Sequence, residues 1–137
     1  MVKPIITAEE AVQMVQNGDT LVIGGSGAGH AIPEKLIEAL GRRFKSTGQP
    51  QKLTVVHISG MGDQGQRGLG HLADERLIKR DIGGHWGMSP PMAKPGIENK
   101  IGGYKLTAGA LDVHLRGTAA RSEEGLLGKG GRSPGRP

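Results

Sequence analysis

The sequence predicts an α/β fold, in which a layered sheet alternates with helices. Two observations support this prediction: short apolar runs of strand length alternate with segments of helical periodicity, and the loops that follow the runs are rich in glycine. In such sheets ligands bind at the carboxyl ends of the strands, where these loops lie. We therefore expect the functional site at the glycine loops.

The composition indicates one domain with a modest aliphatic core. The chain has 137 residues, of which 2% are aromatic and none is cysteine. The absence of cysteine excludes disulfides and thiolate metal sites, and it fits a cytoplasmic protein. No apolar run approaches the length of a membrane helix, and the first residues do not resemble a signal peptide. We therefore expect no membrane partner.

The positive charge does not indicate a nucleic-acid partner. The formal net charge is +5, but residues 1–100 carry twelve basic and ten acidic side chains, so most of the excess lies after residue 100. Aromatic side chains for base stacking are nearly absent. The five histidines show no spacing typical of metal ligands. We expect neither nucleic acid nor metal to bind.

The first part of the chain predicts a helix, a strand, a loop and a second helix. Thr7 and Glu10 form a capping-box pattern, and the helix that they start ends near Gly18. A strand follows at residues 20–23, and then the first glycine loop. The next helix is expected at residues 33–44, because proline is favoured in a first helical turn, where its missing N–H would be unpaired.

The middle of the chain predicts another strand and another glycine loop. Residues 45–52 form a polar linker, and the apolar run at residues 53–58 is a strand. The second glycine loop covers residues 59–70. Residues 72–80 predict a short helix with its apolar residues turned inward.

The signals weaken after residue 88. The proline pair at residues 90–91 can start a helix, but Pro95 and Gly96 are expected to break it one turn later. Residues 109–120 predict a helix that an internal glycine weakens.

The first glycine loop is the strongest candidate for a binding element. It is a run of small residues: Gly24, Gly25, Ser26, Gly27, Ala28 and Gly29. Glycines let backbone N–H groups approach a bulky polar ligand, and the following helix adds unpaired donors and a partial positive charge. The spacing fits neither the dinucleotide fingerprint nor the P-loop. It fits a site for an oxyanion or a phosphate, but a tight strand-to-helix connection explains the pattern about as well.

Four segments stand out along the chain: ITAEEA, GDTLVIGGSGAGHAIPEKLIEAL, GMGDQGQRGLGHLADERLIKR and GGHWGMSP. In this order they resemble the amino-terminal end of family I coenzyme A transferases, most of all the propionate, acetate and 3-oxoacid CoA-transferases. The glycine run that leads to Pro33 and Glu34, and the phrase Gly84-His85-Trp86, are the most specific parts. The resemblance covers residues 4 to about 100, with scattered agreement beyond.

The resemblance implies both a fold and a reaction. The fold is the sheet and helices shared with ribose-5-phosphate isomerases, here incomplete. The reaction transfers CoA from an acyl-CoA to a short-chain carboxylic acid. A glutamate attacks the thioester, and a mixed anhydride and then a glutamyl-CoA thioester follow. Each step builds negative charge on a carbonyl oxygen, which the first glycine loop would stabilise. CoA is thus part of the substrate, and no permanently bound cofactor is expected.

The resemblance also implies residues for an acyl pocket, namely Gly62, Asp63, His85 and Trp86. Two of these have an alternative role. Asp63 can form hydrogen bonds within its own turn, and Trp86 can pack beneath the loops. His30, at the end of the first glycine loop, can hydrogen-bond a ligand or face solvent.

No catalytic residue is expected within the chain. The family's glutamate lies in a glycine-flanked motif of the carboxyl-terminal half, and that motif is absent from all 137 positions. Glu34 and Glu38 are expected on an exposed helix face. The resemblance therefore predicts an inactive amino-terminal fragment. Residues 1–100 match the CoA-transferase domain, residues 101–127 continue it weakly, and residues 128–137 form a disordered tail.

Two functions remain open. In the first, the chain is the amino-terminal segment of a CoA-transferase that forms a homo-oligomer or includes a second CoA-transferase half. In the second, it is a non-catalytic subunit or binding module that pairs with a separate chain carrying the glutamate. A truncated or frame-altered gene product would explain the departure from the family pattern beyond about residue 100. Co-purification with a second chain would favour the subunit.

Overall fold

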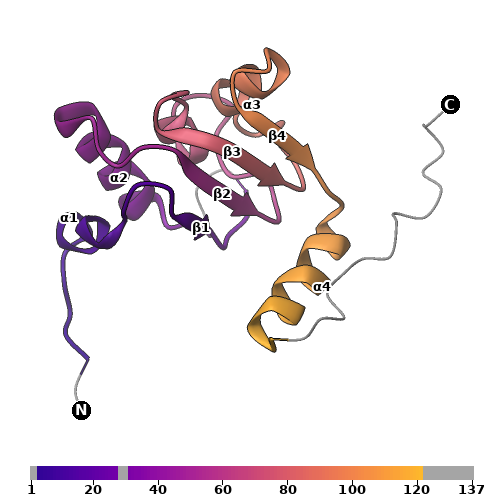
Figure 1. Cartoon of the computed structure of the whole chain (residues 1–137), viewed down its shortest axis with the longest axis horizontal. Helices are drawn as coiled ribbons and strands as arrows, with labels where there is room; N and C mark the ends of the chain where they lie inside the picture. The colour runs from indigo at the N-terminus through magenta and orange to yellow at the C-terminus, as the bar shows by residue number, and fades with distance from the viewer. Residues whose placement is uncertain (1–2, 28–30, 122–137) are drawn as a thin grey trace, which may run out of the picture.

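The computed structural model describes residues 3–27 and 31–121 of the chain. The strands of a single sheet alternate with helices (Figure 1). The strands are β1 (Thr20–Val22), β2 (Leu53–His57), β3 (Ile78–Gly83) and β4 (Gly102–Lys105). The helices are α1 (Ala8–Ala11), α2 (Glu34–Thr47), α3 (Pro90–Ile97) and α4 (Ala108–Ala119), with 3-10 helices at Val12–Met14 and Gly68–Leu72.

The strands lie side by side in chain order, β1-β2-β3-β4, and each neighbouring pair is parallel. All four strands therefore end at the same edge of the sheet, as their arrowheads show in Figure 1. The predicted α/β fold is confirmed. Both glycine loops follow strands, so both lie at the carboxyl edge, where parallel sheets bind ligands.

The capping box near the amino terminus forms as predicted, but the helical segment that it starts ends at Met14, before the predicted end near Gly18. The Thr7 hydroxyl accepts the N–H of Glu10 at 3.2 Å, and the Glu10 carboxylate accepts the N–H of Thr7 at 2.8 Å. These two bonds cap α1. Helix α2 is longer than predicted: it ends at Thr47, where the left-handed Gly48 (φ 70°) closes it, rather than at Phe44.

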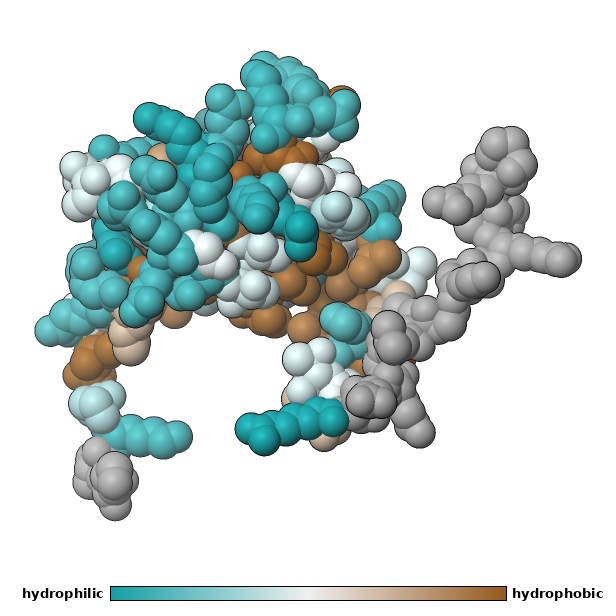
Figure 2. Space-filling view, in the orientation of Figure 1, coloured by the Kyte–Doolittle hydropathy of each residue, from teal (hydrophilic) through white to brown (hydrophobic). Residues whose placement is uncertain are grey.

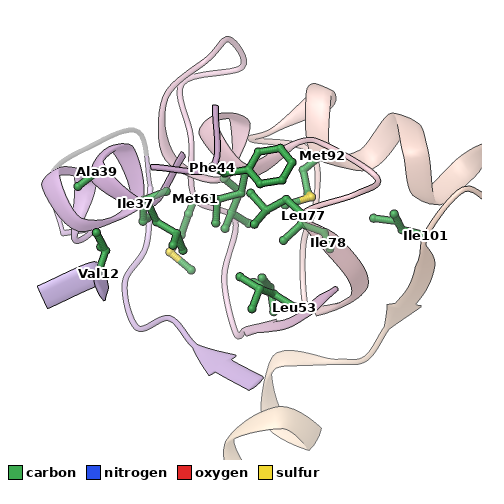
Figure 3. Close-up of a cluster of buried hydrophobic side chains, with 14 residues drawn as sticks. Val12, Ile37, Ala39, Phe44, Leu53, Met61, Leu77, Ile78, Met92 and Ile101 are labelled. Atoms are coloured by element: carbon green, nitrogen blue, oxygen red, sulfur yellow. The ribbon is translucent and has the colours of Figure 1, made fainter. Parts of the chain in front are cut away.

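The core lies between one face of the sheet and a row of helices. Helix α2 packs against the 3-10 helix at Gly68–Leu72, which in turn packs against α3. Their apolar side chains meet those of β2 and β3 in one cluster (Figure 3). The cluster consists of Val12, Ile37, Ala39, Leu40, Phe44, Leu53, Val55, Met61, Leu69, Leu72, Leu77, Ile78, Met92 and Ile101. It is almost entirely aliphatic, as the composition predicts.

The opposite face of the sheet carries an apolar row across all four strands, which we call the outer row. Val22 is paired with Val56, Val56 with Ile82, and Ile82 with Tyr104. Because side chains alternate between the two faces of a strand, the outer row points away from Val55 and the core. Its ends are exposed, Val22 by 58% and Tyr104 by 52%. Figure 2 shows hydrophobic surface between the body of the molecule and α4.

The predicted helix at residues 72–80 is wrong, because a 3-10 helix ends and β3 begins within this segment. The Asp74 carboxylate accepts the N–H of Arg76 at 2.8 Å and forms a turn there. The Leu77 carbonyl then accepts the N–H of Leu53 from β2, also at 2.8 Å. Pairing with β2 therefore overrides the helical spacing of the apolar residues.

Helix α3 forms where a break is predicted, with Pro95 inside it. The Ser89 carbonyl accepts the N–H groups of Met92 and Ala93 at 3.0 and 3.1 Å, which closes the first turn. Pro95 removes one backbone hydrogen bond from a short helix. Met92, which is 1% exposed, anchors the helix in the core. Packing of α3 on the core therefore outweighs the local effect of the proline.

The last described segments are β4 and α4. Strand β4 is absent from the prediction, because it is short and begins with two glycines. Helix α4 confirms the helix predicted at residues 109–120. The disorder predicted for residues 128–137 concerns positions outside the described residues. Within the described ranges, no helix is long and apolar enough to cross a membrane.

Candidate functional site

The first glycine loop turns sharply where β1 ends. Gly25 has a φ of 138° and Gly27 a φ of 83°, which other residues rarely adopt. A Cβ at Gly25 would also collide with the carbonyl oxygen of Ala31. The Ser26 N–H donates to this carbonyl at 3.2 Å, so the loop folds back on the chain that enters α2. The predicted loop members Ala28 and Gly29, and the candidate ligand-binding residue His30, lie outside the described residues.

Hydrogen bonds join the first glycine loop to the second. The Gly27 N–H donates to the Gly60 carbonyl at 3.0 Å, and the Gly62 N–H donates to the Gly27 carbonyl at 3.3 Å. The hydroxyl oxygens of Ser26 and Ser59 lie 3.2 Å apart. The two loops therefore hold each other in place at the carboxyl edge.

These bonds narrow the choice of donors for a ligand. The N–H groups of Ser26 and Gly27 already donate within the protein. In the described part of the chain, the N–H groups of Gly24 and Gly25 meet no acceptor. Gly24 is exposed, and a Cβ there would have no atom within 4 Å. Among the described loop residues, Gly24 and Gly25 are thus the donors that an oxyanion could use, and their role stays a prediction.

The amino terminus of α2 is already occupied by a carboxylate. Pro33, which precedes the helix, has no N–H to offer, and Glu34 lies in the first turn. The Glu34 carboxylate accepts the N–H of Gly68 at 2.9 Å and lies 2.9 Å from Nε2 of His71. The exposed position predicted for Glu34 is therefore wrong. Because this carboxylate compensates the positive end of α2, the helix end does not favour a second anion.

Asp63 shapes the second glycine loop. Its Oδ1 accepts the N–H groups of Gly65 at 2.9 Å and Arg67 at 3.3 Å. The hydrogen bond from Gly65 holds the pKa of Asp63 below its usual range. Of the two roles considered for Asp63, the structure shows the turn-forming one, and contact with a substrate stays a prediction.

The loop that follows β3 packs against the second glycine loop. The Gln64 N–H donates to the Met88 carbonyl at 2.9 Å. A Cβ at Gly60 would lie 2.6 Å from Cδ2 of His85, and one at Gly62 would collide with the Met88 carbonyl. Two residues predicted for the acyl pocket, Gly62 and His85, thus lie in one layer of interlocked loops. Only glycine fits at positions 60 and 62 without displacing this layer.

Trp86 lies on a surface made of glycines. A Cβ at Gly103 or at Gly83 would lie 2.6 Å from its indole, and one at Gly96 of α3 would lie 3.5 Å away. The indole Nε1 is buried and has no hydrogen-bond partner in the described part of the chain. The structure thus shows the packing role considered for Trp86, and a place in an acyl pocket stays a prediction.

A buried pair of a histidine and an aspartate lies beneath the loops. His57 ends β2, Asp81 lies in the neighbouring β3, and they are 0% and 1% exposed. Nε2 of His57 lies 3.0 Å from Oδ1 of Asp81, and Nδ1 lies 2.9 Å from the carbonyl oxygen of Ser59. Burial alone would lower the pKa of His57, but the Asp81 carboxylate outweighs it, so that the pKa is raised.

The sequence patterns do not reveal this pair, because they predict a helix at residues 72–80 and leave Asp81 without a strand beside β2. A usable signal exists, however. His57 ends an apolar strand, and Asp81 is followed by an apolar residue and two glycines in a chain that alternates strands and loops. A polar group in a buried strand requires a partner, and neighbouring parallel strands can supply one.

An apolar cavity of about 250 Å³ lies between α1, β1 and α2. Its lining residues, which include Val15, Leu21 and Leu36, carry no charge and offer nothing to the phosphates of CoA. Among the described residues of the two glycine loops, only Gly24 lines it. The described residues also contain no group of three His, Asp or Glu side chains that could hold a metal ion. The interlocked loops are therefore the better candidate site.

Comparisons with known proteins find coenzyme A transferases. The sequence pattern of a family described as Coenzyme A transferase matches residues 5–128. The chain is 38% identical over 117 residues to the acetate CoA-transferase YdiF of Escherichia coli strain K12, with 85% of this chain and 22% of that protein covered. It is 32% identical over 122 residues to one subunit of a probable succinyl-CoA:3-ketoacid coenzyme A transferase of Bacillus subtilis strain 168, with 88% and 44% covered.

A solved structure has the same fold. The crystal structure of the acyl-CoA transferase YdiF apoenzyme from Escherichia coli O157:H7 matches with a TM-score of 0.84 and 37% identity, covering 87% of this chain and 23% of that chain. A thioester complex of that enzyme with CoA matches equally well, with a TM-score of 0.84. The chain spans 22% of the length of the acetate CoA-transferase and 44% of that of the Bacillus subtilis subunit.

Proposed function

The chain belongs to the coenzyme A transferase family, and on this premise we propose that it is the amino-terminal part of an acyl-CoA:carboxylate CoA-transferase. One observation supports the proposal above all others. The loops after β1, β2 and β3 interlock at the carboxyl edge of the sheet, in a fold that matches a solved acyl-CoA transferase. Such an edge is where parallel sheets bind their ligands.

In the proposed reaction, CoA passes from an acyl-CoA to a carboxylic acid through a thioester on a glutamate. Attack on the thioester carbonyl moves negative charge onto its oxygen, and the later steps repeat this change. The N–H groups of Gly24 and Gly25 would donate to that oxygen. The bond between Gly27 and Gly60 fixes the loop before substrate arrives. In enzymes where one such donor has been removed, the loss is about 3 kcal/mol of transition-state stabilisation.

The nucleophilic glutamate is proposed to come from outside this sequence. Glu34, the glutamate closest in sequence to the first glycine loop, is engaged with Gly68 and His71. Glu9 and Glu38 both pair with Arg42, at 2.7 and 3.2 Å. None of these three carboxylates is placed to attack a thioester held at the loops.

The proposed substrates are an acyl-CoA and a short-chain carboxylic acid. The names of the relatives contain acetate, caffeate and 3-ketoacid, which are all carboxylic acids. These names support a carboxylic acid as the acceptor of CoA, and they do not single out one acid.

A second candidate function is a non-catalytic subunit that pairs with a separate chain. The matches to single subunits of succinyl-CoA:3-ketoacid coenzyme A transferases, 42% to 44% of whose length the chain covers, favour this alternative. In that arrangement the partner chain would supply the glutamate. Co-purification of the chain with such a partner would support it, and recovery of the chain without any partner would count against it.

Transfer of CoA from propionyl-CoA to acetate tests the proposal. The chain alone is expected to show no transfer. A chimera in which residues 5–121 replace the matching segment of the Escherichia coli acetate CoA-transferase is expected to be active. Borohydride treatment and mass spectrometry should then locate the trapped glutamate outside the grafted segment. A folded but inactive chimera would contradict the proposed function, and a trapped glutamate within the grafted segment would show that this chain carries the nucleophile.

A further inference from the structure

The buried pair of His57 and Asp81 takes no part in the proposed chemistry, yet it lies directly beneath the interlocked loops. We propose that His57 is a positioning residue for the candidate site. Its ring, protonated on both nitrogens, links Asp81 to the Ser59 carbonyl and thereby fixes the turn to which the first glycine loop is bonded. This inference rests on the proposed function only in so far as it treats the loops as the binding site.

One contact of the ring requires a proton, and the other favours a second. The Ser59 carbonyl can only accept a hydrogen bond, so Nδ1 of His57 must carry a proton to bond it at 2.9 Å. Nε2 lies 3.0 Å from Oδ1 of Asp81, which is an ion-pair distance, but neither atom has a hydrogen-bond partner in the described part of the chain. Without a proton on Nε2, the Asp81 carboxylate would be buried beside a neutral ring, with neither a counter-charge nor a hydrogen bond to compensate its burial. A doubly protonated ring meets both requirements, since it donates from Nδ1 to Ser59 and supplies the counter-charge of Asp81.

The constraint passes from Ser59 to both loops. The carbonyl of Ser59 and that of Gly60 belong to consecutive peptide units, so rotation of the first displaces the second. The Gly60 carbonyl accepts the N–H of Gly27 at 3.0 Å, and the hydroxyls of Ser59 and Ser26 lie 3.2 Å apart. A change at His57 would therefore reach the first glycine loop through two separate contacts.

Asp81 supplies the charge that acts on His57. Strand β1 carries no ionisable side chain. In β4, Lys105 is in register with His57 through Gly83 of β3, but its side chain is exposed. His85, in the loop after β3, is also exposed, and His71 of the 3-10 helix is paired with Glu34. Loss of the proton from His57 would leave the Asp81 carboxylate buried without a counter-charge, which is strongly unfavourable.

Nuclear magnetic resonance of the full 137-residue chain tests the inference without CoA. In nitrogen-15 spectra, both ring nitrogens of His57 are expected to keep their protons to a pH above the ordinary histidine pKa of about 6.5. The amides of Gly27 and Gly62 form the hydrogen bonds between the two loops. Their hydrogen exchange should accelerate over the pH range in which His57 loses its proton, by more than the ordinary increase of exchange with pH. The acceleration should be about tenfold for each unit by which the pKa of His57 differs between closed and open loops.

Two variants distinguish positioning from general stability. Asp81→Asn removes the charge at nearly constant size, and it should move the titration of His57 and the exchange step together to lower pH. His114→Gln, in α4, removes a histidine elsewhere and should leave the step in place. If Asp81→Asn does not fold, the titration of the wild-type chain decides alone.

Two results would overturn the inference: a His57 ring that loses its second proton at or below the ordinary histidine pKa, or loop exchange that does not follow its titration. Binding of acetyl-CoA to the chimera is a separate measurement. Suppose that hydrogen exchange in the loops follows the titration of His57, but the chimera does not bind acetyl-CoA. This result would contradict the proposed function and leave the positioning role of His57 intact.

Discussion

The N–H of Gly27 donates to the carbonyl of Gly60 at 3.0 Å, and this bond joins the loops after β1 and β2. Gly27 is therefore needed for its backbone conformation and for this bond, rather than as a free donor to a ligand. Gly24 has the opposite properties, since it is exposed, surrounded by open space, and without an acceptor among the described residues.

Valine at these two glycines should have different effects. Gly27→Val is expected to destabilise the chain by roughly 1–3 kcal/mol, because a branched residue at a φ of 83° is strained. Gly24→Val should change stability by no more than about 0.5 kcal/mol, since its Cβ meets no atom within 4 Å. Urea unfolding compares the two. In the active chimera, Gly24→Val should reduce transfer, and unchanged transfer would remove Gly24 from the binding surface.

Gly83→Ala should crowd both His57 of the buried pair and Trp86. A Cβ at Gly83 would collide with the ring of His57 and lie 2.6 Å from Nε1 of Trp86. Overpacking of this kind destabilises by about 1–3 kcal/mol. The matched control is Gly109→Ala in α4, where the Cβ has open space and where alanine should be neutral or stabilising by up to about 1 kcal/mol. Equal melting temperatures for the two variants would show that β3 adapts to the added methyl group.

The stability of the chain should fall as the pH rises above neutral. Because the pKa of His57 is raised in the folded state, its proton stabilises the fold fully below the ordinary histidine pKa of about 6.5. This contribution is lost as the pH rises through the raised pKa. Urea midpoints between pH 6 and pH 9 measure it. Asp81→Asn should flatten the dependence, and an unchanged slope in that variant would assign it to another group.

Glu34→Gln should loosen the second glycine loop. The Glu34 carboxylate accepts the N–H of Gly68 and contacts His71, and hydrogen bonds to a charged acceptor are stronger than neutral ones, so the loss should be about 1–2 kcal/mol. Glu38→Gln is the control, because its exposed pair with Arg42 contributes about 0.5 kcal/mol or less. Urea unfolding measures both, and equal effects would mean that Glu34 does not hold the loop.

The sequence predicts best those elements whose decisive contacts are local. The capping box of Thr7 and Glu10 is an example, since both hydrogen bonds lie within four residues. Residues 72–80 show the reverse. The spacing of their apolar side chains is helical, but the carbonyl of Leu77 pairs with Leu53 of a distant strand, which no local pattern reveals.

The same difference between local and tertiary contacts applies to the candidate site. Glycine runs after apolar runs predict correctly that both loops meet at one edge of the sheet. The bond between Gly27 and Gly60 decides which backbone N–H groups of the first glycine loop remain available to a ligand. The register of β2 with β3 decides that His57 and Asp81 lie together. The role of Glu34 likewise depends on Gly68, which lies far along the chain. These are tertiary contacts, and sequence patterns locate the loops without showing them.

The outer row has a consequence for how the stability of this chain can be measured. Parallel sheets ordinarily have both faces covered, and the ends of this row, Val22 and Tyr104, are more than half exposed. An apolar face of this kind lowers its free energy by associating with any other apolar surface, including a second copy of itself. Mass action then couples folding to association, so the unfolding midpoint of the isolated chain should rise with its own concentration. A free energy of unfolding measured for this chain therefore has meaning only together with the concentration at which it was obtained.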